Sequence, residues 1–147
     1  MEGVRRDDVE AVARTVYGEA RGSEFKGKLA VAYVIVNRLE APETWWQQEP
    51  GDDVLDDTLE AVAKDPWQFS CWNESNPNLG KLVSVSLSDE SFRVCYMAAL
   101  MAITKHVEDP TGGACYYYAD YIDMPDWAKN LKKTEKIGVH NFFKDKG

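Results

Sequence analysis

Apolar residues recur at helical spacing near the start of the chain. Between residues 7 and 21 they return at steps of three, four and seven, as on one face of an α-helix. Asp7 or Asp8 would cap the N-terminus of this helix, and Gly22 is a suitable residue just after its C-terminus. We therefore predict a helix that ends near Arg21, with these residues on its apolar face: Val9, Val12, Ala13, Val16, Tyr17 and Ala20.

Two further long helices are predicted. One begins at Ser23 to Phe25 and ends near Leu39, and its centre, LAVAYVIV, is apolar on nearly every side. A buried strand would have the same composition, but a length of about four turns favours a buried central helix. The other covers residues 89–106, follows Ser88, and has one apolar face formed by Phe92, Cys95, Tyr96, Ala99 and Ile103.

The remaining segments are shorter. Residues 41–53 have the composition of a loop, and residues 54–64 show a short helical pattern that Pro66 stops. The segment WQFSCWNESNPNLG predicts an extended stretch followed by a turn-rich loop. Aromatic and β-branched residues predict strands at 115–119 and 135–143. The expected fold class is therefore mainly α with a small β hairpin or sheet (α+β).

Composition limits the class of protein. The chain has 147 residues, of which 44% are hydrophobic, and no repeat or linker, so residues 1–147 are expected to form one domain. A net charge of −8 argues against a partner made of nucleic acid, because phosphates are bound by basic faces. No apolar run approaches the ~20 residues of a membrane span, so no membrane insertion is expected.

The cysteines and histidines form no recognisable ligand set. Cys71, Cys95 and Cys115 are widely spaced and odd in number, so we expect free, buried thiols. Together with His106 and His140 they do not show the spacing of zinc ligands. We therefore expect no metal and no cofactor.

Glu19 has an unusual place in the first predicted helix. At 100° per residue it lies roughly 80° from the centre of the apolar face, in the last turn, between core and solvent. The helix C-terminus carries partial negative charge and partial burial disfavours ionisation, so both effects favour the protonated form that a general acid needs. The alternative is an ordinary surface glutamate paired with Arg14, Arg21 or Lys28.

Four segments resemble one known family. ARTVYGEARGSEFKGKLAVAYVIVNR resembles the opening of the spore cortex-lytic enzyme type of cell wall hydrolases, with its Y-x-E-A-R-G helix end and an apolar helix that ends in N-R. WQFSCW resembles the Q-F-S/T segment of that family, DPTGGACYYY its T-G-G-A-x-Y-Y-Y segment, and KIGVHNFF its I-G-x-H-x-F terminus. The likeness covers about residues 11 to 143, and four motifs in the same order are a specific signal.

The resemblance implies a catalytic activity. It implies a lysozyme-like helical core that cleaves peptidoglycan glycan strands between N-acetylmuramic acid and N-acetylglucosamine, with Glu19 as general acid and base. No second carboxylate lies in a signature segment, since Glu24 begins the next helix and Glu74, Asp109 and Asp120 lie in predicted loops. A single glutamate suits a lytic transglycosylase, in which the muramyl 6-hydroxyl replaces the attacking water of a hydrolase.

Polar candidates for substrate binding lie in the QFSCWN segment. Gln68, Ser70 and Asn73 could donate hydrogen bonds to N-acetyl groups or to Glu19. Ser70 is the strongest of these candidates, because a hydroxyl group near the acid can hold its proton in position.

Two aromatic residues and a histidine complete the predicted binding site. Phe69 and Tyr117 are candidates for stacking on sugars. Alternation along strand 115–119 places Tyr117 on one face and Tyr116 and Tyr118 on the other, without showing which face lines the groove. His140 is a further candidate, although a structural, hydrogen-bonded role is more common for a histidine on a strand.

The N-terminal sequence indicates how the protein would reach the cell wall. MEGVRRDDVE contains two arginines but no apolar run, so we expect synthesis in the cytoplasm without a secretory signal peptide. Family members often carry such a signal and a separate wall-binding module, whereas this chain resembles the single-domain versions of phages. We therefore expect an endolysin-like, bacteriolytic enzyme that a holin or a virion delivers to the periplasm and cell wall.

Three other interpretations stay open. A hydrolytic muramidase would use the same Glu19 with a water molecule. A metal-dependent amidase would use His106 and His140, although their spacing argues against it. A non-catalytic cell-wall-binding protein would bind peptidoglycan without cutting it.

Overall fold

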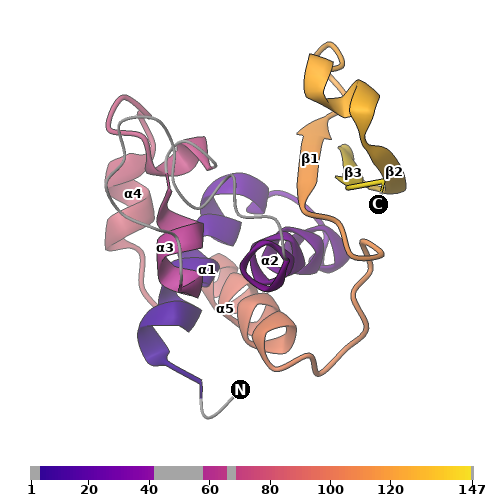
Figure 1. Ribbon diagram of the computed structural model, residues 1–147. Helices are drawn as coiled ribbons and strands as arrows, with labels where there is room; N and C mark the ends of the chain where they lie inside the picture. The colour runs from indigo at the N-terminus through magenta and orange to yellow at the C-terminus, as the bar shows by residue number, and fades with distance from the viewer. Residues whose placement is uncertain (1–3, 42–57, 66–68, 147) are drawn as a thin grey trace.

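Three long helices form the centre of the fold. The computed structural model describes residues 4–41, 58–65 and 69–146 of the chain. The helices of this part are α1 (Arg6–Ala20), α2 (Phe25–Glu40), α3 (Leu59–Lys64), α4 (Leu79–Ser84) and α5 (Glu90–Ile103), with short 3-10 turns η1 (Ser70–Trp72) and η2 (Asp126–Asn130). Helices α1 and α2 pack on each other and on α5, and α3 packs on α1 (Figure 1).

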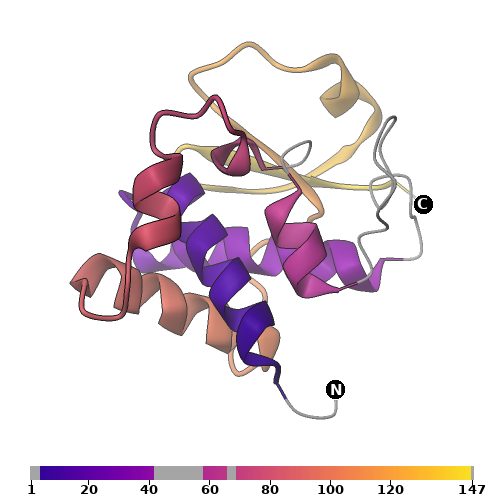
Figure 2. The same cartoon turned by 90° about the vertical axis from the view of Figure 1, so that its left-hand side faces the viewer.

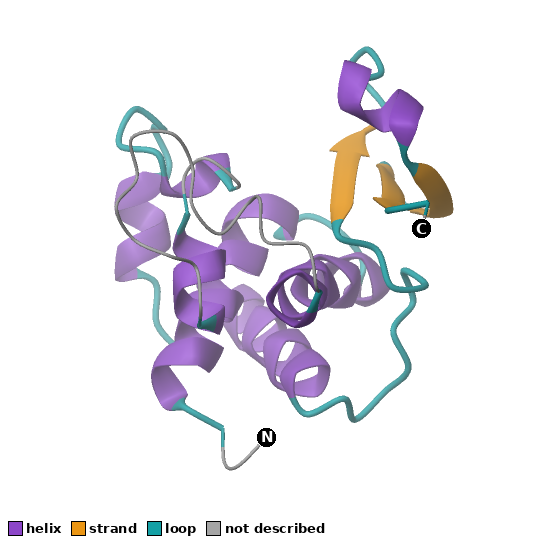
Figure 3. Cartoon of the chain, viewed as in Figure 1, coloured by secondary structure: helices purple, strands orange, loops and turns teal. Residues whose placement is uncertain are grey.

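A small sheet lies beside the helices. Its strands are β1 (Tyr116–Ala119), β2 (Lys132–Ile137) and β3 (His140–Lys144), in the spatial order β1-β3-β2 with antiparallel neighbours. Figure 2 shows the strands lying over one side of the helices, and Figure 3 distinguishes the orange sheet from the purple helical part. The predicted class, mainly α with a small sheet, is confirmed.

Helix α2 is buried on all sides. Every residue from Gly27 to Val36 is buried, including Lys28, whose ammonium group donates a hydrogen bond to the carbonyl of Ser23. Burial from every direction explains why its sequence shows no polar face. The prediction of a buried central helix is therefore confirmed and the strand alternative is excluded.

The ends of the long helices differ from the prediction by a few residues. Helix α1 has Arg5 at its N-cap without a side-chain cap, so the prediction of Asp7 or Asp8 as N-cap is wrong. Asp8 lies in the first turn, and its carboxylate accepts a hydrogen bond from the backbone of Glu60 in α3 at 3.0 Å. Helix α5 is capped by Asp89, whose side chain accepts from the N–H of Phe92, and it ends at Ile103.

Helix α4 lies where the sequence predicts only loop. Its six residues are too few to show a helical period, and tertiary contacts support it instead. The guanidinium of Arg14 donates to the carbonyls of Leu82 and Val85 at 3.0 and 2.7 Å, which satisfies acceptors at the helix C-terminus. The preceding helix α3 is shorter than predicted and begins after Thr58; residues 54–57 lie outside the described part of the chain.

The second predicted strand is a hairpin. Residues 135–143 contain the end of β2, a turn at Gly138 and Val139, and most of β3, so the prediction of one continuous strand is wrong. Gly138 has φ +59°, a conformation that glycine adopts without steric cost, and it reverses the chain. The reversal pairs Ile137 with His140 and brings β3 between the other two strands.

The last turn of α2 holds the segment that leads into the sheet. The amide of Asn37 donates to Asp109 Oδ2 at 2.9 Å and to the carbonyl of Ala114 at 3.0 Å. The buried guanidinium of Arg38 donates to the carbonyl of Cys115 at 2.7 Å. These bonds fix the start of β1 against α2, so the N-R pair has a structural role that positions the aromatic strand.

The three cysteines are free and buried, as predicted. Burial raises the pKa of Cys95 to about 11, so this thiol stays protonated at neutral pH. Within the described residues, no helix combines the length and apolar character that crossing a membrane requires.

Candidate active site

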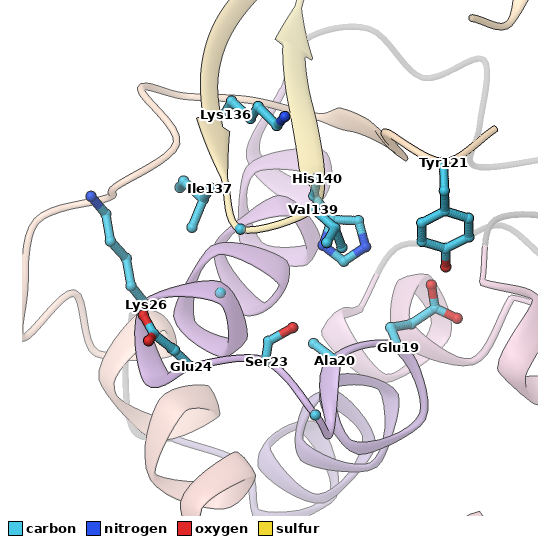
Figure 4. Close-up of a pocket in the computed structure, with 13 residues that line it drawn as sticks. Glu19, Ala20, Ser23, Glu24, Lys26, Tyr121, Lys136, Ile137, Val139 and His140 are labelled. Atoms are coloured by element: carbon cyan, nitrogen blue, oxygen red, sulfur yellow. The ribbon is translucent and has the colours of Figure 1, made fainter. Parts of the chain in front are cut away.

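Glu19 lies in the last turn of α1 at the edge of a cavity of about 530 Å³. Its side chain is half-buried, as its position beside the apolar face predicts. Helix α1, the start of α2, the segment after β1 and the β2–β3 hairpin all contribute to the cavity (Figure 4). The lining residues are Glu19, Ala20, Gly22, Ser23, Glu24, Lys26, Gly27, Tyr121, Lys136, Ile137, Gly138, Val139 and His140.

The basic residues near Glu19 in the sequence have other partners. Arg14 forms an ion pair with Glu10 at 3.2 Å, and the guanidinium of Arg21 lies over the ring of Tyr17 at 4.5 Å. Among the described residues, no ion pair includes Glu19. The alternative of a surface glutamate in a salt bridge is therefore not what the structure shows.

Tyr117 contacts Glu19 directly. Its hydroxyl group donates a hydrogen bond to Oε1 of Glu19 at 2.5 Å, across 98 residues of sequence. Burial, and then the charge of Glu19, hold the pKa of Tyr117 well above its usual value of 10.0. The phenol therefore stays protonated and acts as a permanent donor to the carboxyl group. Tyr117, which the sequence predicts as a stacking residue, thus contacts the candidate acid through its hydroxyl group.

The structure also decides which face of β1 is turned toward Glu19. Tyr117 faces Glu19, whereas Tyr116 and Tyr118 pack against Trp127 on the other face, with ring centroids at 5.8 and 6.0 Å. The predicted alternation of the three tyrosines is confirmed, and Tyr117 is the one that contacts Glu19.

His140 completes this side of the cavity. Its ring lies edge-on to the ring of Tyr117, with centroids at 5.0 Å, and only 8% of the residue is exposed. Burial lowers the pKa of His140 below its usual 6.5, against the opposite effect of Glu19 and Asp120. The imidazole is therefore neutral at neutral pH and can donate or accept a hydrogen bond with a ligand in the cavity.

Cys71 is a neighbour of Glu19 that the sequence analysis does not identify. Burial raises the pKa of this thiol, and the charge of Glu19 and a hydrogen bond to it contribute further. The thiol group is therefore a second neutral group beside the carboxylate. Its position in QFSCW, next to Ser70, is the only sequence signal that could have indicated it.

The predicted binding residues of the QFSCWN segment that the structure describes are not among the residues that line the cavity. Phe69 is fully buried beneath the guanidinium of Arg38, which lies 4.8 Å from the ring centre, so the prediction that Phe69 stacks on a sugar does not hold. Ser70 is exposed at the start of η1, and the side chain of Asn73 accepts hydrogen bonds from Ser75 in the following turn. Gln68 lies outside the described residues.

Gly18 leaves room for Cys71 beside the acid. A Cβ atom at Gly18 would lie 2.7 Å from Cys71 Cβ and 2.9 Å from its Sγ. Gly→Ala substitutions within a helix normally stabilise a protein, but at Gly18 the close contact with Cys71 makes the substitution destabilising. We expect Gly18→Ala to lower the free energy of unfolding by about 1–3 kcal/mol in urea titrations, because η1 must move away from α1.

Two variants control this prediction. Gly80→Ala lies in α4 with no atom within 4 Å of the added Cβ, so it should hold or raise stability. Cys71→Gly should relieve the contact, so the double variant should be more stable than the sum of the single effects. Additive effects in this cycle would show that Cys71 does not limit the space at Gly18.

Several cavity residues give no sequence signal for a functional role. Tyr121 lies two residues after the end of β1, Lys136 lies in β2, and Ser23, Glu24 and Lys26 lie at the start of α2. They meet only because the hairpin folds back over α1 and α2. Among the described residues, no group of three or more His, Cys, Asp or Glu side chains could hold a metal ion.

The arrangement can perform acid–base chemistry. The carboxyl group of Glu19 faces the cavity, a protonated phenol donates to one of its oxygens, and a neutral imidazole lies beside the phenol. A proton on the free carboxyl oxygen can then be delivered to a ligand atom in the cavity.

Comparison with known proteins points to one family. The family model described as Cell Wall Hydrolase matches residues 22–143, a range that begins shortly after Glu19. The chain is 30% identical over 140 residues to the spore cortex-lytic enzyme of Halalkalibacterium halodurans, 29% over 149 to that of Oceanobacillus iheyensis, and 25% over 140 to that of Bacillus subtilis. The matches cover 95%, 97% and 95% of this chain, so they include Glu19.

The chain spans less than half the length of these relatives, namely 36%, 44% and 38%. It corresponds instead to nearly the whole of two solved structures. The catalytic domain of the germination-specific lytic transglycosylase SleB from Bacillus anthracis has a TM-score of 0.70 at 28% identity, with 98% of this chain and 99% of that chain covered. The catalytic domain of the Bacillus cereus SleB protein has a TM-score of 0.71 at 28% identity, with 98% and 94% covered.

Proposed function

Because the chain belongs to the cell wall hydrolase family, we propose that it cleaves peptidoglycan glycan strands between N-acetylmuramic acid and N-acetylglucosamine, with Glu19 as the catalytic acid. The observation that carries this proposal is the carboxyl group of Glu19, which faces the cavity while Tyr117 holds one of its oxygens at 2.5 Å. The likeness to the catalytic domain of a lytic transglycosylase supports the reaction type.

The proposed reaction uses Glu19 twice. The protonated carboxyl group first donates its proton to the bridging oxygen, and the bond from that oxygen to C1 of the muramyl residue breaks. The muramyl 6-hydroxyl oxygen then bonds to C1, and its proton returns to Glu19. The products are an N-acetylglucosamine end and a 1,6-anhydromuramyl end, and no water is consumed.

The surrounding residues have supporting roles in this proposal. Tyr117 is a positioning residue, since its hydroxyl group keeps the carboxyl group turned toward the cavity. His140 is neutral, largely buried and part of the cavity lining, where it can hydrogen-bond an acetamido group of the substrate. Ser70, Asn73 and Gln68 stay predicted substrate contacts.

Hydrolysis is the second candidate function. Glu24, exposed at the N-cap of α2, lines the same cavity as Glu19, so a second carboxylate is present in the groove. If Glu24 activated a water molecule as general base, the enzyme would be an inverting muramidase instead of a transglycosylase. Glu24→Gln separates the two, because only the hydrolase would lose most of its turnover.

Mass spectrometry of fragments released from purified peptidoglycan tests the reaction directly. We expect muramyl ends in the 1,6-anhydro form, which are lighter by one water than reducing ends. Reducing ends would establish hydrolysis. Binding of sacculi without any released fragment would contradict both catalytic proposals and leave a wall-binding protein.

Delivery to the wall is a separate question. We propose the holin- or virion-mediated route that the sequence predicts, whereas the relatives compared above are spore cortex-lytic enzymes. Expression in bacterial cytoplasm with and without a co-expressed holin tests it: lysis that does not depend on the holin would contradict this route.

A further inference from the structure

Tyr121 is the most exposed large apolar residue at the cavity. It is 78% exposed, although it lines the same cavity as Glu19. In Figure 4 its ring lies above Glu19, with the hydroxyl end directed toward the Glu19 carboxylate. An aromatic side chain that the fold leaves uncovered beside an acid is available to a ligand.

The backbone that carries Tyr121 is held in place. The N–H of Asp120 donates to the carbonyl of Val139 at 2.7 Å, and Lys136 forms an ion pair with the Asp120 carboxylate at 2.9 Å. The N–H of Ile122 donates to the carbonyl of Ala119 at 3.2 Å, which closes a turn around Tyr121. The first two contacts tie this segment to the β2–β3 hairpin and the third fixes its turn, so an exposed ring is carried on a positioned backbone.

Half of the exposed large apolar residues belong to one part of the chain. Of the ten exposed large apolar residues in the described chain, five lie between residues 121 and 139. Two of them, Tyr121 and Val139 (45% exposed), line the cavity and form an apolar wall next to its polar residues. A sugar ring in its chair form has apolar C–H faces and polar edges, so it matches a wall of this kind.

We propose that Tyr121 is a sugar-binding residue that stacks on the pyranose ring of an N-acetylhexosamine beside the bond that Glu19 protonates. This inference rests on the proposed function and adds a specific subsite to it. A tyrosine ring has only two side-chain torsions, so ordering it against a ligand costs little entropy. Covering the ring also removes apolar surface from water.

Steady-state kinetics on peptidoglycan glycan strands freed of their stem peptides test this subsite. We expect Tyr121→Ala to raise KM about tenfold while kcat changes little, because the ring contributes to binding rather than to proton transfer. Tyr121→Phe keeps the ring and should stay close to wild type. Met124→Ala removes an exposed apolar side chain of the same loop that does not line the cavity, and it should leave KM unchanged.

Three outcomes would overturn the inference. An unchanged KM in Tyr121→Ala, with normal cleavage by the wild type, would refute it and leave the proposed function intact. An equal loss in Tyr121→Phe would assign the contact to the hydroxyl group instead of the ring. An effect confined to intact, peptide-bearing walls would assign it to the stem peptide. A wild-type protein that releases no fragments would refute the proposed function itself.

Discussion

Replacing Glu19 by glutamine is expected to lower the rate of wall cleavage at least a hundredfold. General-acid catalysis contributes roughly 10²–10⁴ in rate, and the loss is larger if one residue serves both proton transfers. The amide oxygen of glutamine can still accept the hydrogen bond from Tyr117, so the melting temperature should stay close to that of the wild type. Turbidity clearing of purified sacculi measures the rate, and co-sedimentation measures retained binding.

Two glutamate variants serve as controls for this result. Glu60→Gln, in α3 and paired with Lys64 on the surface, should clear walls at the wild-type rate. Glu24→Gln lines the same cavity and should lose less than tenfold under the transglycosylase mechanism. Near wild-type clearing by Glu19→Gln would remove the catalytic assignment altogether.

Replacing Tyr117 by phenylalanine is expected to have the next largest effect. The variant keeps the ring contacts with His140 and Phe142 but loses the hydroxyl group that donates to Glu19 at 2.5 Å. A hydrogen bond to a charged group contributes about 1.5–3 kcal/mol, which corresponds to about a ten- to hundredfold fall in kcat. KM should change little, because the lost contact is with the enzyme's own acid and not with the substrate.

Tyr118→Phe is the matched control for Tyr117→Phe. Tyr118 is the next residue of β1, on the opposite face, stacked on Phe143 with centroids at 5.5 Å. Its variant should keep kcat and KM. If Tyr117→Phe raised KM and left kcat unchanged, Tyr117 would be a substrate contact, as the sequence prediction had it, and not a positioning residue.

Much of the helical framework follows from local pattern. The apolar run of α2 is long enough to indicate a helix, and the spacing of Phe92, Cys95, Ala99 and Ile103 indicates α5. Helix α4 and the β2–β3 hairpin were not predictable in this way. The first is supported by Arg14 from a distant helix, and the second depends on one glycine within an otherwise strand-like run.

The candidate site also has features that follow from local sequence and features that depend on tertiary contacts. Glu19 was identifiable because its helical phase and its signature motif agree, both of which are local properties. The partner of Tyr117 was not identifiable, because the two residues are 98 positions apart and meet only when Asn37 and Arg38 hold the start of β1 against α2. Strand alternation separated Tyr117 from its neighbours but could not say which face would be the inner one.

By itself, the sequence determined the class of fold and the buried central helix, and it indicated Glu19 as the candidate acid. These follow from periodicity and motif, which act within one segment. Only the tertiary structure decided that Phe69 belongs to the core, that Cys71 lies beside Glu19, and that Tyr121 stands exposed at the cavity. The direction in which a side chain points from a short turn or loop is set by contacts with other elements, here α1, α2 and the hairpin. Such contacts leave no local pattern in the sequence.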